Sequence, residues 1–329
     1  MILDGRSDDA IAAAVRALKA GELVGLPTET VYGLAGDAGN DRAVARIFET
    51  KGRPADHPLI VHVADAASVD HFAADVPDFA RRLIDAFWPG PLTLILPRRA
   101  GVGAAAAGGQ DSIGLRCPSH PVAQALLRAC AAQGVHGLAA PSANPFGRVS
   151  PTTAAHVQAG LGEALLVLDG GACDVGIEST IVDCTRGAPV LLRPGGVSRA
   201  QVEAASGQRL RARDELATPA PRASGTLLAH YAPSAPVRLM DAKALQTALD
   251  LLGADAAHLA LYARAPLKMR SSRVEYRRMP DDAAATAQQL FAVLRDFDAA
   301  GARLIWIETP PDTPDWEAVR DRLQRAAAA

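Results

Sequence analysis

Short apolar runs alternate with amphipathic segments through the first 210 residues. Short apolar runs between polar turns are typical of buried strands, and apolar residues repeated at three- or four-residue spacing are typical of helices. The pattern predicts helices at 11–19, capped by Ser7 and ended by Gly21, and at 41–50, 77–88 and 121–132; it predicts strands at 23–27, 58–64, 92–97, 112–118, 138–143, 165–169, 179–184 and 189–195. We therefore expect an α/β fold with a large, mixed sheet.

The pattern changes after residue 210. Residues 211–236 are rich in proline and show little periodicity, which is typical of a linker. Beyond them the pattern predicts strands at 237–240, 258–263, 274–279 and 303–309, helices at 241–252 and 281–301, and a last helix after Pro314. We expect a larger domain over 1–210, a linker over 211–236 and a smaller α/β domain over 237–329.

Composition excludes several classes of protein. The formal net charge of −2 disfavours a strongly basic nucleic-acid binder, and no run approaches the roughly 20 apolar residues of a membrane helix. The N-terminus lacks the apolar core of a signal peptide. The four cysteines form no C-x-x-C pair, so neither a zinc site nor a disulfide framework is expected, which fits a reducing cytoplasm.

Common nucleotide motifs are absent. Residues 101–106 read GVGAAA, but no strand leads directly into them and a glycine-rich stretch follows instead of a helix, so we interpret them as a surface loop. The sequence has no Walker A motif, no H-E-x-x-H and no G-x-S-x-G. An ATP-dependent enzyme with this sequence would have to bind its nucleotide without a P-loop.

Four polar segments follow predicted strands or helices, where α/β proteins usually form their sites. Taken singly, each has an ordinary interpretation. Lys51 and Arg53 suit the negative end of a helix as well as a phosphate, and His62 suits a hydrogen-bonded core position. Ser142 and Asn144 are common turn residues. The segments cover 27–34, 51–62, 141–150 and 176–195.

The sequence contains, in this order, PTETVYGL, KGRP followed by PLIVH, RCP, APSAN, SPT, and GIESTIVD followed by LRPG. Taken together, these motifs resemble the YrdC-like family, and the resemblance covers about residues 10–210. The tail, including HYAP in the linker, resembles the long form of the family, which adds a small Rossmann-like domain. The resemblance implies a YrdC-like domain with a large twisted mixed sheet and an open cleft.

The resemblance also implies an activity. Members of this family are threonylcarbamoyl-AMP synthases, nucleotidyltransferases that condense L-threonine, bicarbonate and ATP, with Mg²⁺, into threonylcarbamoyl-adenylate and pyrophosphate. The product passes to the machinery that transfers threonylcarbamoyl to tRNA. For this chain the resemblance implies a cytoplasmic enzyme with no membrane partner, and it leaves a weak direct contact with tRNA open.

The site residues follow from the resemblance, position by position. The signature residues fall on Lys51, Arg53, Ser142 and Asn144; the threonine contacts on Thr30, His62, Arg116, Ala140 and Ser179; and the ATP contacts on Arg53, His57, Ser112, Ser142, Ser150, Arg193 and Tyr231. No metal ligand is assigned to a protein side chain. Position 57 is usually Asn in the family and position 112 is often Thr, so we expect altered detail at His57 and Ser112.

Other interpretations predict other sequence features. An RNA-binding module would need a basic aromatic platform, and a carbamoyl-transfer relative of the hydrogenase-maturation type would need zinc-finger cysteine pairs; a short-form paralogue would lack the tail. The linker is itself unusually long for a domain connection. We expect it to act as a lid that closes when ATP arrives, with Tyr231 on the nucleotide and the linker then protected from proteolysis; a passive tether is the alternative.

Overall fold

A computed structural model describes residues 1–216 and 220–329. The described chain forms two compact units, one made of Met1–Phe146 with Ser150–Thr226 and the other of Gly147–Val149 with Leu227–Ala329. The expected linker, 211–236, is shared between these units, and its residues 217–219 lie outside the described residues. The domain boundaries at 210 and 236 therefore stay a prediction.

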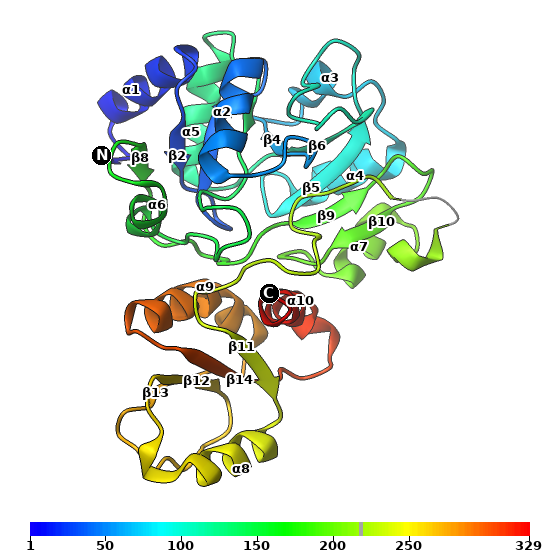
Figure 1. The fold of residues 1–329 in the computed structure, drawn as a ribbon. Helices are drawn as coiled ribbons and strands as arrows, with labels where there is room; N and C mark the ends of the chain where they lie inside the picture. Colours follow the sequence, from blue (N-terminus) through cyan, green and yellow to red (C-terminus); the bar gives the residue numbers. More distant parts are fainter. Residues whose placement is uncertain (217–219) are drawn as a thin grey trace. The chain divides into compact units, whose positions relative to one another are not determined.

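The first unit is built on one sheet of ten strands in the order β1-β8-β2-β3-β7-β4-β6-β5-β9-β10 (Figure 1). The sheet contains parallel pairs such as β4 with β6 and antiparallel pairs such as β5 with β6, so the expected large mixed sheet is confirmed. The strands are β1 (Ile2–Asp4), β2 (Val24–Leu26), β3 (Gly33–Asp37), β4 (Ile60–His62), β5 (Leu92–Pro97), β6 (Ser112–Arg116), β7 (Leu138–Ala139), β8 (Leu166–Asp169), β9 (Thr180–Asp183) and β10 (Val190–Arg193).

Helices of the first unit bury their apolar stripes against the sheet in two hydrophobic clusters. Asn40 caps α2 by accepting hydrogen bonds from two backbone N–H groups, whereas Ser7 holds the N-cap position of α1 without a side-chain hydrogen bond. The expected position of Ser7 at the start of this helix is confirmed, although its side chain makes no capping hydrogen bond. The helices are α1 (Asp8–Lys19), α2 (Asp41–Lys51), α3 (Val69–Phe72), α4 (Asp78–Phe87), α5 (Pro121–Ala131), α6 (Ala154–Leu161) and α7 (Arg199–Ser206), with a 3₁₀ turn at Arg213–Glu215.

Strand β3 has no counterpart among the predicted strands, because its sequence GLAGD lacks β-branched and aromatic residues. Its glycines are required by close packing. A Cβ on Gly36 would lie 3.0 Å from a methyl group of Leu23, and one on Gly33 would lie 3.1 Å from the Cβ of Ala140. Close approach of neighbouring side chains to its backbone, not side-chain propensity, therefore explains this strand.

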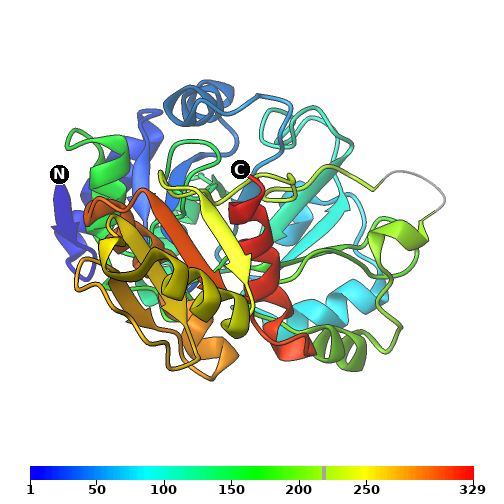
Figure 2. The same ribbon diagram turned by 60° about the horizontal axis from the view of Figure 1, so that its bottom comes forward.

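The second unit is a four-stranded parallel sheet in the order β11-β14-β12-β13. Helix α8 covers one face and α9 and α10 cover the other (Figures 1 and 2). Across the described residues, no helix is long and apolar enough to cross a membrane. The elements are β11 (Val237–Met240), α8 (Ala242–Leu252), β12 (Leu259–Ala263), β13 (Glu275–Arg278), α9 (Ala283–Ala299), β14 (Leu304–Glu308) and α10 (Glu317–Ala327), with 3₁₀ turns at Gly253–Asp255 and Pro314–Trp316.

Candidate active site

One face of the large sheet collects the predicted binding residues through strand alternation. Successive side chains of a strand point to opposite faces, so Ser112, Gly114 and Arg116 of β6 share a face. The register aligns His62 of β4 with Arg116 and Ile60 with Gly114. The face therefore has a polar end at Arg116 and His62, and an apolar middle that continues toward Ser112.

Helix α2 delivers Lys51 to the loop that carries Ser142 and Asn144. The helix ends at Gly52, whose φ of 61° is left-handed, and Lys51 is buried in the last turn. Its Nζ donates to the main-chain oxygen of Ser142 at 2.5 Å and to that of Asn144. Burial lowers the pKa of Lys51 well below its usual value, Arg53 lowers it further, and Glu178 opposes both. The Lys51 side chain thus holds the backbone of the loop in place.

Arg53 lies just beyond this helix end and is also buried. Its guanidinium donates to the main-chain oxygens of Pro58 (2.9 Å) and His57 (3.3 Å) and lies 5.6 Å from the centre of the Phe146 ring. The His57 ring makes an edge contact with the same phenyl ring, at 5.5 Å. Partial burial, followed by the charge of Arg53, lowers the pKa of His57 below its usual value. His57 is therefore held neutral next to the cation.

Asn144 of this loop is buried, as is Ser150 a few residues further on. The hydroxyl of Ser150 donates to Oε1 of Glu178, which is itself buried, and the amide of Asn144 donates to the main-chain oxygen of Pro145 at 2.8 Å. Because Glu178 also acts on the pKa of Lys51, the carboxylate joins the cation and the hydroxyl in one buried polar group.

Arg116 is the centre of the polar end. Its Nη1 donates to the hydroxyl of Thr30 at 2.8 Å and its Nε to the main-chain oxygen of Gly90 at 3.3 Å. Its Nη2 lies 2.7 Å from Oε1 of Glu29, forming an ion pair with both side chains buried. A second threonine hydroxyl, that of Thr28, contacts Thr30 at 2.9 Å. The arginine is thereby fixed in one orientation before any ligand arrives.

His62 lies beside Arg116 and is almost fully buried. Burial lowers the pKa of His62 to about 3; the charge of Arg116 adds to this effect, and a backbone hydrogen bond to Ile60 opposes it. The imidazole is consequently neutral at physiological pH. Ala140, the fifth residue predicted to contact threonine, is buried next to this strand and donates its N–H to the main-chain oxygen of Ile60 at 3.0 Å.

Ser179 connects the polar end to Arg193. Its hydroxyl contacts that of Thr93 at 2.8 Å, and its main-chain oxygen accepts from Nη2 of Arg193 at 2.8 Å and from Nε at 3.1 Å. Nη1 of Arg193 reaches the main-chain oxygen of Ser224, at 3.1 Å. Arg193 thus joins the end of β9 to the segment that was expected to be the linker.

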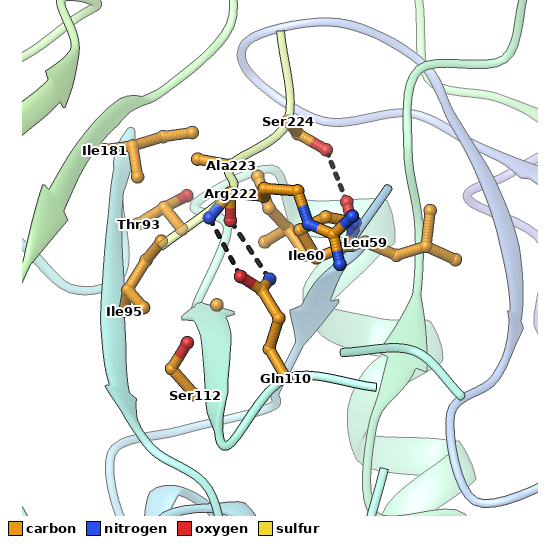
Figure 3. A pocket seen from close by; sticks show the side chains of 12 residues that line it. Leu59, Ile60, Thr93, Ile95, Gln110, Ser112, Ile181, Arg222, Ala223 and Ser224 are labelled. Carbon is orange, nitrogen blue, oxygen red and sulfur yellow. Dashed lines mark hydrogen bonds between the residues drawn. The ribbon is translucent and has the colours of Figure 1, made fainter. Parts of the chain in front are cut away.

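The apolar middle of the face is covered by residues 222–224 (Figure 3). Ala223 packs on a cluster formed by Ile95, Ile181, Val190 and Leu192. The backbone of Arg222 exchanges two hydrogen bonds with the Gln110 side chain, at 2.8 and 3.2 Å, and the Ser224 hydroxyl donates to Pro58 at 3.0 Å. About 10 Å³ remains beneath the segment, close to the space of one water molecule. The expected open cleft is filled here by the chain itself.

The first unit brings together every predicted site residue except Tyr231. That residue belongs to the second unit, where it is buried with φ 62°, its ring 5.5 Å from that of Phe291 and 5.2 Å from the guanidinium of Arg322. Sequence reasoning missed Glu29, Glu178, Thr93 and Gln110. The two glutamates could have been found, because both lie inside the polar segments and an acidic residue beside a predicted cation site is a signal in itself.

Comparison with known proteins assigns the chain to a family. Residues 16–195 match a family model described as "Telomere recombination", and residues 197–328 match one described as "Threonylcarbamoyl-AMP synthase, C-terminal domain". Threonylcarbamoyl-AMP synthase of Bacillus subtilis is 35% identical, with 98% of this chain and 94% of that protein covered. The chain belongs to the threonylcarbamoyl-AMP synthase family.

The similarity to members of this family extends over both units of the chain. The Pyrococcus abyssi threonylcarbamoyl-AMP synthase is 35% identical, with 94% of this chain and 92% of the relative covered. The crystal structure of Pyrococcus abyssi Sua5 complexed with L-threonine has a TM-score of 0.88 at 34% identity and covers 99% of this chain and 97% of that one. The predicted family and its long, two-domain form are confirmed.

Proposed function

We propose that the chain makes threonylcarbamoyl-adenylate and pyrophosphate from L-threonine, bicarbonate and ATP. The observation that carries the proposal is the arrangement on a single sheet face. Arg116 and His62, which suit an amino acid, lie at one end of this face. Gly114 and Ile60 are the next residues along the same face, and Ser112 follows them. An amino acid and an adenosine bound along this face would have their reacting groups between them.

The polar end suits threonine. The Arg116 guanidinium is the natural partner of its carboxylate, and Thr30, Ser179 and the neutral His62 supply hydrogen-bonding groups for its hydroxyl. Ala140 gives the remaining wall a small apolar side chain. A buried site that pairs with the threonine hydroxyl would discriminate against amino acids that lack it.

The nucleotide would lie toward the other predicted residues. Arg53, Arg193 and Lys51 are cations that can stabilise the charge developing on phosphate oxygens, and Ser142, Ser150 and Asn144 are hydrogen-bonding groups on the loop that Lys51 braces. His57 and Ser112 would contact the rest of the nucleotide. Mg²⁺ would enter with ATP and be held chiefly by its phosphates, the usual mode of binding for this ion.

The reaction needs no covalent enzyme intermediate. The threonine amine forms a C–N bond with CO₂ derived from bicarbonate, releasing a proton and giving a carbamate. A carbamate oxygen then bonds to the α-phosphorus as the bond to the β-phosphate oxygen breaks, and pyrophosphate leaves. The protein's part is to hold three reactants together and to keep water from the carbamate. Such a product is an activated carbamoyl donor, suited to the enzymes that modify tRNA in the cytoplasm.

The product itself tests the proposed function. With ATP, L-threonine and bicarbonate labelled with a heavy carbon isotope, mass spectrometry should find a labelled threonylcarbamoyl-adenylate. Label must be absent when the protein is omitted. An adenylate of threonine without the bicarbonate carbon would instead indicate ordinary amino-acid activation and contradict the proposal.

The linker should act as a gate that opens for the nucleotide. Residues 222–224 fill the middle of the face, so ATP must displace them there. The segment would thus open when ATP arrives, whereas the sequence led us to expect that it closes.

Trypsin digestion tests this gate. Trypsin cleaves after arginine, and the bond between Arg222 and Ala223 lies within this segment. ATP with threonine is expected to speed cleavage after Arg222 several-fold. Cleavage after the exposed Arg209 is the internal control. Protection of Arg222 by ATP would restore the closing lid, and no change would favour the passive tether.

A further inference from the structure

The polar end contains three buried atoms that lack a hydrogen bond among the described residues: Oε1 of Glu29, Nη2 of Arg116 and Nδ1 of His62. Most buried polar atoms in proteins are hydrogen-bonded, so a buried polar atom without a hydrogen bond needs a physical reason. All three meet at Arg116, since Glu29 pairs with it and His62 lies beside it across the β4–β6 register. Their clustering points to a ligand that satisfies them together.

The two charged groups are near each other without being matched. Oε1 of Glu29 and Nη2 of Arg116 are 2.7 Å apart, yet the angles are not those of a hydrogen bond. Both groups are anchored elsewhere: Oε2 of Glu29 accepts from the Ser119 N–H at 3.1 Å, and Arg116 donates to Thr30 and Gly90. The facing atoms therefore keep their remaining hydrogen-bonding capacity in a fixed place.

The needs of the three atoms differ. Oε1 of Glu29 can only accept and favours a positively charged donor, whereas Nη2 of Arg116 can only donate and favours an anionic acceptor. The neutral His62 ring offers Nδ1 to a hydroxyl. A molecule with an ammonium, a carboxylate and a hydroxyl group on adjacent carbons satisfies all three, and a β-hydroxy α-amino acid has this chemistry.

We propose that Glu29 binds the α-ammonium group of the amino-acid substrate, so that the Glu29–Arg116 pair recognises the zwitterion as a unit. The inference rests on the proposed function, to which it adds a substrate-binding residue outside the set predicted from sequence. The carboxylate of Glu29 would face the ammonium group of the amino acid, and the guanidinium of Arg116 would face its carboxylate. The four buried charges then sum to zero. The neutral side chain of glutamine at this position would leave the ammonium without its counter-charge.

Binding of two ligands by the full chain tests the assignment. L-Threonine and (R)-3-hydroxybutyrate share the carboxylate and the hydroxyl, but only threonine carries the amino group. Calorimetry should show that Glu29→Gln weakens threonine binding by about tenfold or more, the usual range for a hydrogen bond to a charged group. Binding of 3-hydroxybutyrate, which has no ammonium group, should not weaken. Glu49→Gln, at an exposed position on α2, should leave both affinities unchanged.

A purely structural role predicts a different result. If Glu29 only orients Arg116, Glu29→Gln would weaken both ligands equally, and that outcome overturns the inference. Glu29→Asp provides the second variant should the glutamine form fail to fold: it keeps the charge but withdraws it by one methylene, and should again affect threonine alone. Wild-type protein that binds 3-hydroxybutyrate but not threonine would also overturn the inference. Wild-type protein that binds neither would contradict the proposed function itself.

Discussion

Lys51→Ala is expected to lower turnover by a factor of at least ~100, the size of effect seen when one group that stabilises a transition state is removed. The substitution deletes a cation next to the proposed phosphates. It also removes the donor that joins the main-chain oxygens of Ser142 and Asn144, so the loop loses its brace. Steady-state kinetics with saturating substrates measures the loss.

Two companion variants serve as controls for this result. Lys51→Met keeps most of the unbranched side chain and removes the charged amino group that donates to the loop, so it should lose nearly as much turnover. Lys19→Ala, at the exposed end of α1 where Nζ contacts the Gln133 side chain, should keep the wild-type rate. Wild-type turnover in both Lys51 variants would show that the lysine only closes a helix end.

Arg116→Lys is expected to raise KM for threonine by about tenfold or more, in line with the loss of a charged hydrogen bond. The guanidinium donates to Thr30 and Gly90, faces Glu29, and has three further N–H groups from which to serve a carboxylate. An ammonium has three donors in all and cannot match that fork. KM for ATP should stay within about twofold, because the substitution acts at the amino-acid end of the face.

Arg128→Lys is the matched control for this substitution. Arg128 lies at an exposed position on α5, where it donates to the Gln124 side chain at 3.0 Å. It should leave both KM values unchanged. Equal increases in the two KM values of Arg116→Lys would indicate general damage to the sheet, and an unchanged KM for threonine would remove the carboxylate assignment.

The fold could be predicted wherever the local pattern is strong. Strands rich in branched apolar residues, such as β5 and β10, and amphipathic helices such as α2 and α4 follow directly from periodicity. Strand β3 could not be predicted, because its glycines are there to let Leu23 and Ala140 approach its backbone. That reason exists only once the chain has folded.

The site was predictable as a set of residues but not as a set of contacts. Alternation along β6 already places Ser112 and Arg116 on one face, and the motifs select them. The pairing of Gln110 with Arg222 joins positions 112 residues apart, and no local pattern predicts such a contact. For the same reason, the sequence suggested a lid but did not reveal that residues 222–224 lie in the pocket.

Coupling of three small molecules by one protein is tested most directly by the release of pyrophosphate. The assay follows pyrophosphate from ATP and Mg²⁺ in degassed buffer, because dissolved CO₂ would otherwise supply the bicarbonate. We expect rapid release only when L-threonine and bicarbonate are both present, near-background release when either is omitted, and a clearly lower rate with L-serine in place of threonine. Release at the full rate without threonine, or without bicarbonate, would contradict the proposed function.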